Sequence, residues 1–121
     1  MRALIRTVAA AAAVVTVLLA ATGGQAVVFP HVYWTNHGAL NVPCETTVCT
    51  IGRANLDGTG ADQSFVTGAT KPAGVAVYSN YVYWANAFAG TIGRANLDGT
   101  GVEQGFITGA SAPAGVAVDA G

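Results

Sequence analysis

The chain has 121 residues, of which six are acidic, five are Lys or Arg and two are His, so its formal net charge at pH 7 is −1. Hydrophobic residues make up 52% of the chain and charged residues only 9%. This length supports one small domain, and the charge excludes the basic surface of a nucleic-acid-binding protein and the basic amphipathic helix of a membrane-surface protein.

The first 26 residues are predicted to be a secretory signal peptide. Arg2 and Arg6 give a positively charged start, an acid-free apolar run covers residues 8–21, and small residues follow up to Ala26. This arrangement is typical of such peptides. A membrane anchor is the alternative, but the run is shorter than the roughly 20 residues that span a bilayer as a helix. We therefore expect cleavage after Ala26, a secreted mature domain of residues 27–121, and no membrane span after cleavage.

Cys44 and Cys49 are the only two cysteines and lie in one predicted loop. In an exported protein, two close cysteines most often form a disulfide. A metal site is the alternative, but a lone pair of cysteines lacks further ligands, and His31 and His37 do not have a zinc-like spacing. The sequence therefore predicts a Cys44–Cys49 disulfide that holds the shape of the loop.

An internal repeat covers most of the chain. Residues 50–60 and 91–101 are identical, and residues 65–77 return as 106–118 with three changes, at the same offset of 41 residues. Repeats of this length indicate that the fold is built from similar units. We place the first unit at about residues 32–77 and the second at about 78–118.

Each unit is predicted to contain short β-strands separated by turns. Aromatic and β-branched residues favour strands, and an Asp-Gly-Thr-Gly sequence favours a hairpin turn because glycine accepts a positive φ. Pro72-Ala73-Gly74 is expected to be a turn. The units contain no apolar pattern with a period of 3.6 residues, so no helix is predicted in them. In chain order, the strands expected around the second unit are 75–77, 81–84, 91–97 and 106–108. Four short strands in about 41 residues predict an all-β fold of propeller blades.

Three motifs present in both units resemble the YWTD repeats of the low-density lipoprotein receptor class. They are Tyr-Trp-Thr-Asn (33–36), Ile-Gly-Arg-Ala-Asn-Leu-Asp-Gly (51–58) and Pro-Ala-Gly-Val-Ala-Val (72–77). The fourth motif position holds Asn36 and Asn86 rather than Asp, and the third holds Ala85 in the second copy. Asparagine keeps the hydrogen-bonding shape without the charge, so the same structural role is expected. The resemblance implies a six-bladed β-propeller, of which this chain carries two four-stranded blades.

Two units leave an open end on each side, and repeat architectures generally need three or more units. Six residues separate Val77 from Trp84, and the same spacing separates Val118 from Trp34 if the His31 of a second copy follows Gly121 directly. This register predicts a homotrimer that closes a six-bladed ring. A truncated gene product without independent function is the alternative.

No catalytic constellation is apparent. Neither histidine has a serine or cysteine nucleophile with an orienting acid, and the loops around Asp57 and Asp98 lack the spaced oxygen ligands and closing Glu of a calcium site. An Asx turn explains both aspartates. We therefore expect no enzyme activity, no cofactor and no metal. The alternative, a fragment of a lactonase- or lyase-like propeller enzyme, needs several acids, asparagines or histidines that converge on the axis.

The candidate ligand-binding residues are those where the copies differ in connecting loops, together with the tryptophans that suit carbohydrate stacking: His37, Phe88, Trp34 and Trp84. Loops on a rigid scaffold commonly carry function, whereas core packing is the alternative for the tryptophans. Structural roles are expected for the remaining duplicated residues: Tyr33, Tyr83, Arg53, Arg94, Asn55, Asn96, Asp57 and Asp98. The sequence thus predicts a secreted, non-enzymatic binding or scaffold module for protein or carbohydrate.

Overall fold

The structure, a computed structural model, describes residues 30–38 and 49–121. The strands in these residues are β2 (His31–Asn36), β3 (Thr50–Asn55), β4 (Asp62–Val66), β5 (Pro72–Tyr78), β6 (Tyr81–Asn86), β7 (Thr91–Asn96) and β8 (Glu103–Thr108). In this part of the chain no helix is suited by length and apolarity to cross a membrane. The predicted signal peptide and Cys44 lie outside the described residues, so the cleavage site and the disulfide stay predictions.

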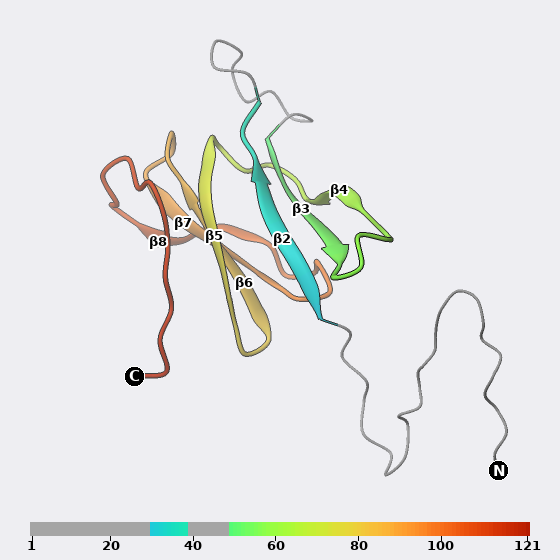
Figure 1. The fold of residues 1–121 in the computed structure, drawn as a ribbon. Coiled ribbons are helices and arrows are strands. Elements are labelled where there is room, and N and C mark those ends of the chain that lie inside the picture. Colours follow the sequence, from blue (N-terminus) through green and yellow to red (C-terminus); the bar gives the residue numbers. More distant parts are fainter. Residues whose placement is uncertain (1–29, 39–48) are drawn as a thin grey trace, which may run out of the picture. The chain divides into compact units, whose positions relative to one another are not determined.

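The strands form two antiparallel sheets in which neighbours along the chain are neighbours in the sheet (Figure 1). The first sheet has the order β2-β3-β4, and the second has the order β5-β6-β7-β8. The all-β prediction is therefore confirmed. The second sheet has the four strands expected of a blade, whereas the first sheet has three among the described residues, because no described strand pairs with the outer edge of β2. The two sheets do not close on each other.

The strand β5 begins earlier than the sequence suggests. Pro72-Ala73-Gly74 was expected to form a turn, but Pro72 lies opposite Asn86 within the β5–β6 pair. The register shifts between Pro72 and Val75, which marks a bulge. A bulge bends a strand without ending its pairing, so the prediction of a turn is wrong.

In both sheets a glycine makes room for a tryptophan on the neighbouring strand. Trp84 pairs with Gly93, and Trp34 pairs with Gly52. A Cβ atom added at either glycine would lie 2.3 Å from the Cε2 atom of its tryptophan. Glycine at these strand positions is therefore required by the close approach of the ring.

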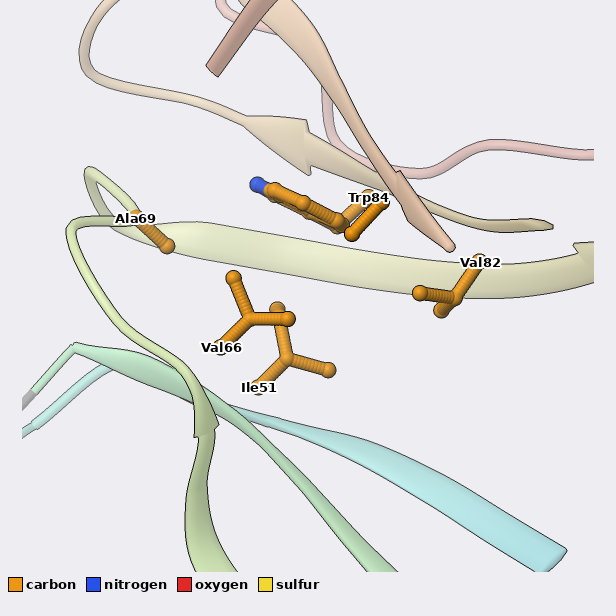
Figure 2. Packing of buried hydrophobic residues seen from close by; sticks show 6 residues of the cluster. Ile51, Val66, Ala69, Val82 and Trp84 are labelled. Carbon is orange, nitrogen blue, oxygen red and sulfur yellow. The ribbon is translucent and has the colours of Figure 1, made fainter. Parts of the chain in front are cut away.

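The hydrophobic core lies between the two sheets. The first sheet contributes Ile51 and Val66, the connection to β5 contributes Ala69, and the second sheet contributes Val82 and Trp84 (Figure 2). Each of these side chains is at most 3% exposed. Complete burial of a Val or Ile side chain contributes about 1.5–3 kcal/mol, so this contact is the main apolar term that joins the sheets.

We expect Gly93→Ala to lower the free energy of unfolding by about 1–3 kcal/mol, because the new methyl group meets a ring that is buried and cannot move away. Urea denaturation followed by tryptophan fluorescence measures the change. Gly105→Ala is the matched control, since it adds a methyl group to β8 with its nearest neighbouring atom at 3.8 Å. Equal effects of the two substitutions would contradict a role for the Trp84 contact.

Candidate functional site

The asparagine at the fourth motif position joins the strands of the second sheet. Asn86 is fully buried. Its Nδ2 donates to Thr91 Oγ1 at 3.1 Å and to both Gln104 O and Gln104 Oε1 at 3.0 Å. Its Oδ1 accepts a hydrogen bond from the backbone N of Thr70 at 3.0 Å. The residue therefore uses donor and acceptor together, which a carboxylate cannot do.

A glutamine completes the same network in each sheet. Trp84 Nε1 donates to Gln104 Oε1, and Trp34 Nε1 donates to Gln63 Oε1, both at 3.1 Å. Trp84 is fully buried, so its ring packs in the core and presents no face to a sugar. Sequence reasoning missed both glutamines because they lie outside the identical motifs, although the offset of 41 residues relates them.

The identical turns contain the Asx turns that the sequence predicts. Asp98 Oδ1 accepts from Thr100 N at 2.9 Å and from Thr100 Oγ1 at 2.6 Å, and Asp57 has the same bonds with Thr59. The threonine hydroxyls are the main reason that the pKa of each carboxyl is lowered. Gly99 has a φ of 89°, in the region that favours glycine.

No group of three His, Cys, Asp or Glu side chains in residues 30–38 and 49–121 is placed to hold a metal ion. In both turns the aspartate oxygen already accepts hydrogen bonds from the threonine two residues further on. The turn geometry therefore explains why an aspartate and a threonine occur in both copies of this loop.

The arginine of each sheet packs on an aromatic ring, but the two guanidinium groups have different hydrogen-bond partners. The guanidinium carbon of Arg53 lies 4.2 Å from the ring centroid of Phe65, and its Nη1 donates to Leu97 O at 2.9 Å across the two sheets. That of Arg94 lies 3.9 Å from the centroid of Phe106, and its Nη2 forms an ion pair with Glu103 at 2.8 Å. Arg53 therefore links the sheets, whereas Arg94 stays within the second sheet.

The second sheet carries a copy of the apolar surface with which the first sheet contacts the core, but no sheet packs on this copy among the described residues. Val66 is 1% exposed between the sheets, but Ile107, which occupies the same position in the second copy, is 50% exposed. Phe106 is likewise 37% exposed. We name the surface of Arg94, Phe106 and Ile107 the trailing face.

The first sheet likewise carries a copy of the apolar surface with which the second sheet contacts the core. Val82 is fully buried, whereas its copy Val32 is 46% exposed. Trp34 is half-buried although Trp84 is fully buried, and Gln63 is exposed. We name the surface of Val32, Trp34 and Gln63 the leading face. The two faces are the two halves of the internal interface, each without the partner that its copy has.

The loop candidates lie in connections between strands. His37 follows β2 and is exposed, and Phe88 follows β6 and is 81% exposed. They occupy two separate connections, and the two candidate tryptophans belong to different sheets. The structure thus distributes the four predicted ligand-binding residues over both repeats.

Comparison with protein-family models gives no match, and comparison with curated proteins gives none either. What the fold and faces define is an all-β protein of two antiparallel sheets, with a duplicated side-chain network in each and an open copy of the core contact on either side.

We expect Asn86→Asp to lower the free energy of unfolding at neutral pH by about 2–3 kcal/mol, because the carboxylate cannot donate to Gln104 and Thr91. The deficit should shrink on acidification, since the protonated carboxyl regains one donor. Chemical denaturation at several pH values measures this dependence. Asn80→Asp, at an exposed position, is the control. A pH-independent deficit would contradict the donor role.

The Asx turns should add to acid sensitivity. Since the folded state lowers the pKa of Asp57 and Asp98, their contribution is present above the ordinary carboxyl pKa and is lost as pH falls through the folded value. The paired substitution Asp57→Asn and Asp98→Asn keeps the acceptor but removes the titration. Its melting temperature should therefore fall less than that of the wild type between about pH 5 and 2. An unchanged slope of melting temperature against pH would contradict this.

Proposed function

We propose that this chain is a secreted, non-enzymatic scaffold module of the β-propeller kind. The two sheets are neighbouring blades, and protein binds to the leading and trailing faces. The YWTD-like motifs supply the parts that each blade repeats: the tryptophan over its glycine, the asparagine network and the Asx turn. Stacked units of this kind bury a continuous core between neighbours.

The exposure of Ile107 carries the proposal. Val66, which occupies this position in the first sheet, is buried against the second sheet. The packing of Val66 therefore shows how the exposed Ile107 side chain can be buried by a neighbouring sheet. Val32 gives the same contrast with Val82 on the opposite side. Exposed apolar surface that matches an existing interface favours a protein partner.

Protein fits these faces better than carbohydrate. The trailing face combines Ile107 with the Arg94–Glu103 ion pair at 2.8 Å, and the leading face combines Val32 with Trp34 and the polar Gln63. Such a mixture of an apolar centre and charged rim suits a second protein surface. The aromatic platform that a sugar would need is reduced, because Trp84 is buried.

A chain extended by one further repeat tests the proposal. Because Gly121 corresponds to Asn80 in the repeat, a copy of residues 81–121 appended after Gly121 continues the pattern in register. Ile107 is 50% exposed, so burial of its exposed half by the added unit should raise the free energy of unfolding by roughly 0.8–1.5 kcal/mol, half the value for a whole side chain. Guanidinium denaturation measures the gain.

The same extension on an Ile107→Arg chain is the matched control and should show less gain. If the extended chain is no more stable than the original, or if Ile107→Arg makes no difference to the gain, the trailing face is not a docking surface for a repeat.

A further inference from the structure

We propose that the partner of both faces is a second copy of this chain, which docks head-to-tail and adds its residues 113–119 as a strand along the edge of β2 that no described strand occupies. The inference rests on the proposed scaffold role and names the protein that the faces bind. It follows from three observations: an unpaired strand sequence, an open strand edge, and an internal interface that serves as template.

The strand sequence near the C-terminus is used in only one of its two copies. Pro-Ala-Gly-Val-Ala-Val at 72–77 lies in β5 and pairs with β6. The same six residues at 113–118 belong to no sheet, and most of them are exposed. They run beside β5, where a Cβ atom on Gly74 would lie 2.9 Å from the Cα of Gly115 (Figure 1). A sequence that forms a strand elsewhere in this chain is thus left without strand partners.

Among the described strands, the complementary open edge lies on the first sheet. β6 pairs with β5 on one side and β7 on the other, whereas its copy β2 pairs with β3 alone among the described strands. The two strands share Val-Tyr-Trp and a final asparagine. An open edge of this kind accepts an added strand through backbone hydrogen bonds.

The pairing of β5 with β6 fixes the register. Pro72 lies opposite Asn86, Val75 opposite Trp84 and Val77 opposite Val82. The corresponding pairs between two chains place Pro113 opposite Asn36, Val116 opposite Trp34 and Val118 opposite Val32 of the neighbour. These last partners are identical in type to the internal ones, so the added strand meets the same side chains.

Side-chain hydrogen bonds follow the same template. Within the chain, Thr70 N donates to Asn86 Oδ1 and Gln104 Nε2 donates to Thr67 O. Between chains, the equivalent donors are Ser111 N to Asn36 Oδ1 of the neighbour, and the neighbour's Gln63 Nε2 to Thr108 O.

Arg94 completes the interface. Arg53 uses its Nη1 to reach Leu97 O on the second sheet, and Leu56 is the copy of Leu97. Within its own sheet, Arg94 binds Glu103 through Nη2 and also has a side-chain hydrogen bond with Tyr83. By the template of Arg53, its guanidinium would donate to Leu56 O of a neighbour in the assembly. Ile107 then stands to the neighbour's Val32 as Val66 stands to Val82.

One interface that joins a trailing face to a leading face leaves the first chain with an open leading face and the second chain with an open trailing face. Such heterologous contacts form a ring when the rotation closes. The three-chain ring expected from the sequence is one such assembly. Because the contact joins two different faces, a chain with a blocked leading face can still bind a chain with a blocked trailing face, although neither can bind its own kind.

The test uses two variants of the purified chain, Val32→Arg on the leading face and Ile107→Arg on the trailing face. Both positions are about half exposed, so the added charge is tolerated within one chain. By light scattering after size exclusion, the wild type should have a multiple of the single-chain mass and each variant alone the single-chain mass. An equimolar mixture should form a dimer, because one intact interface remains. Phe88→Arg, in an exposed connection outside both faces, should assemble as the wild type does.

Hydrogen exchange locates the added strand. When only the Val32→Arg chain carries ¹⁵N, the labelled segment 113–119 should exchange at least tenfold more slowly in the mixed dimer than in that variant alone. When the ¹⁵N label is carried by the Ile107→Arg chain instead, its segment 113–119 should exchange as fast in the mixed dimer as in that variant alone.

Three results would overturn the inference: a monomeric wild type, an assembly that both arginine variants leave intact, or a mixture that stays monomeric. A monomeric wild type leaves the scaffold proposal to be judged by the appended repeat, so the two failures are distinguishable.

Discussion

The contact of the Trp84 ring with Gly93 determines where the other parts of the structure lie. The ring reaches this position only because β7 has no side chain there. Its Nε1 then binds Gln104 on β8, and its apolar surface packs in the cluster that contains Ile51 and Val66 of the first sheet (Figure 2). One side chain thus ties three strands of its own sheet to the neighbouring sheet.

The repeat gives identical side chains different environments. Val32 and Val82 lie opposite Ala54 and Ala95 in the same register, but only Val82 also lies opposite Val77 of β5 and packs in the core between the sheets. The difference cannot come from local conformation, since both copies pair in the same register. It arises from position within the stack, as expected when stability is a sum of units and of contacts between neighbours. The internal interface therefore serves as a reference for the exposed faces.

Sequence reasoning located what depends on local interactions. The strands and both Asx turns follow from alternation, glycine and aspartate at turn positions, which act over a few residues. The roles of Gln63 and Gln104 did not follow, because their partners come from strands brought together only by folding. The continuation of β5 through Pro72 depends on a bulge stabilised by pairing with Asn86. Burial of Trp84 and exposure of Ile107 depend on which sheet lies alongside.

The tight connection between β5 and β6 decides which strand can occupy the edge of β6. Only Ser79 and Asn80 separate these strands, and Tyr78 lies directly opposite Tyr81. A tether this short gives the local strand an effective concentration in the millimolar range, far above that of a free chain in dilute solution. A second copy of the same strand sequence on a free chain in dilute solution therefore competes poorly with β5. Covalent proximity, rather than any difference in side chains, decides which of two equal strands belongs to β6.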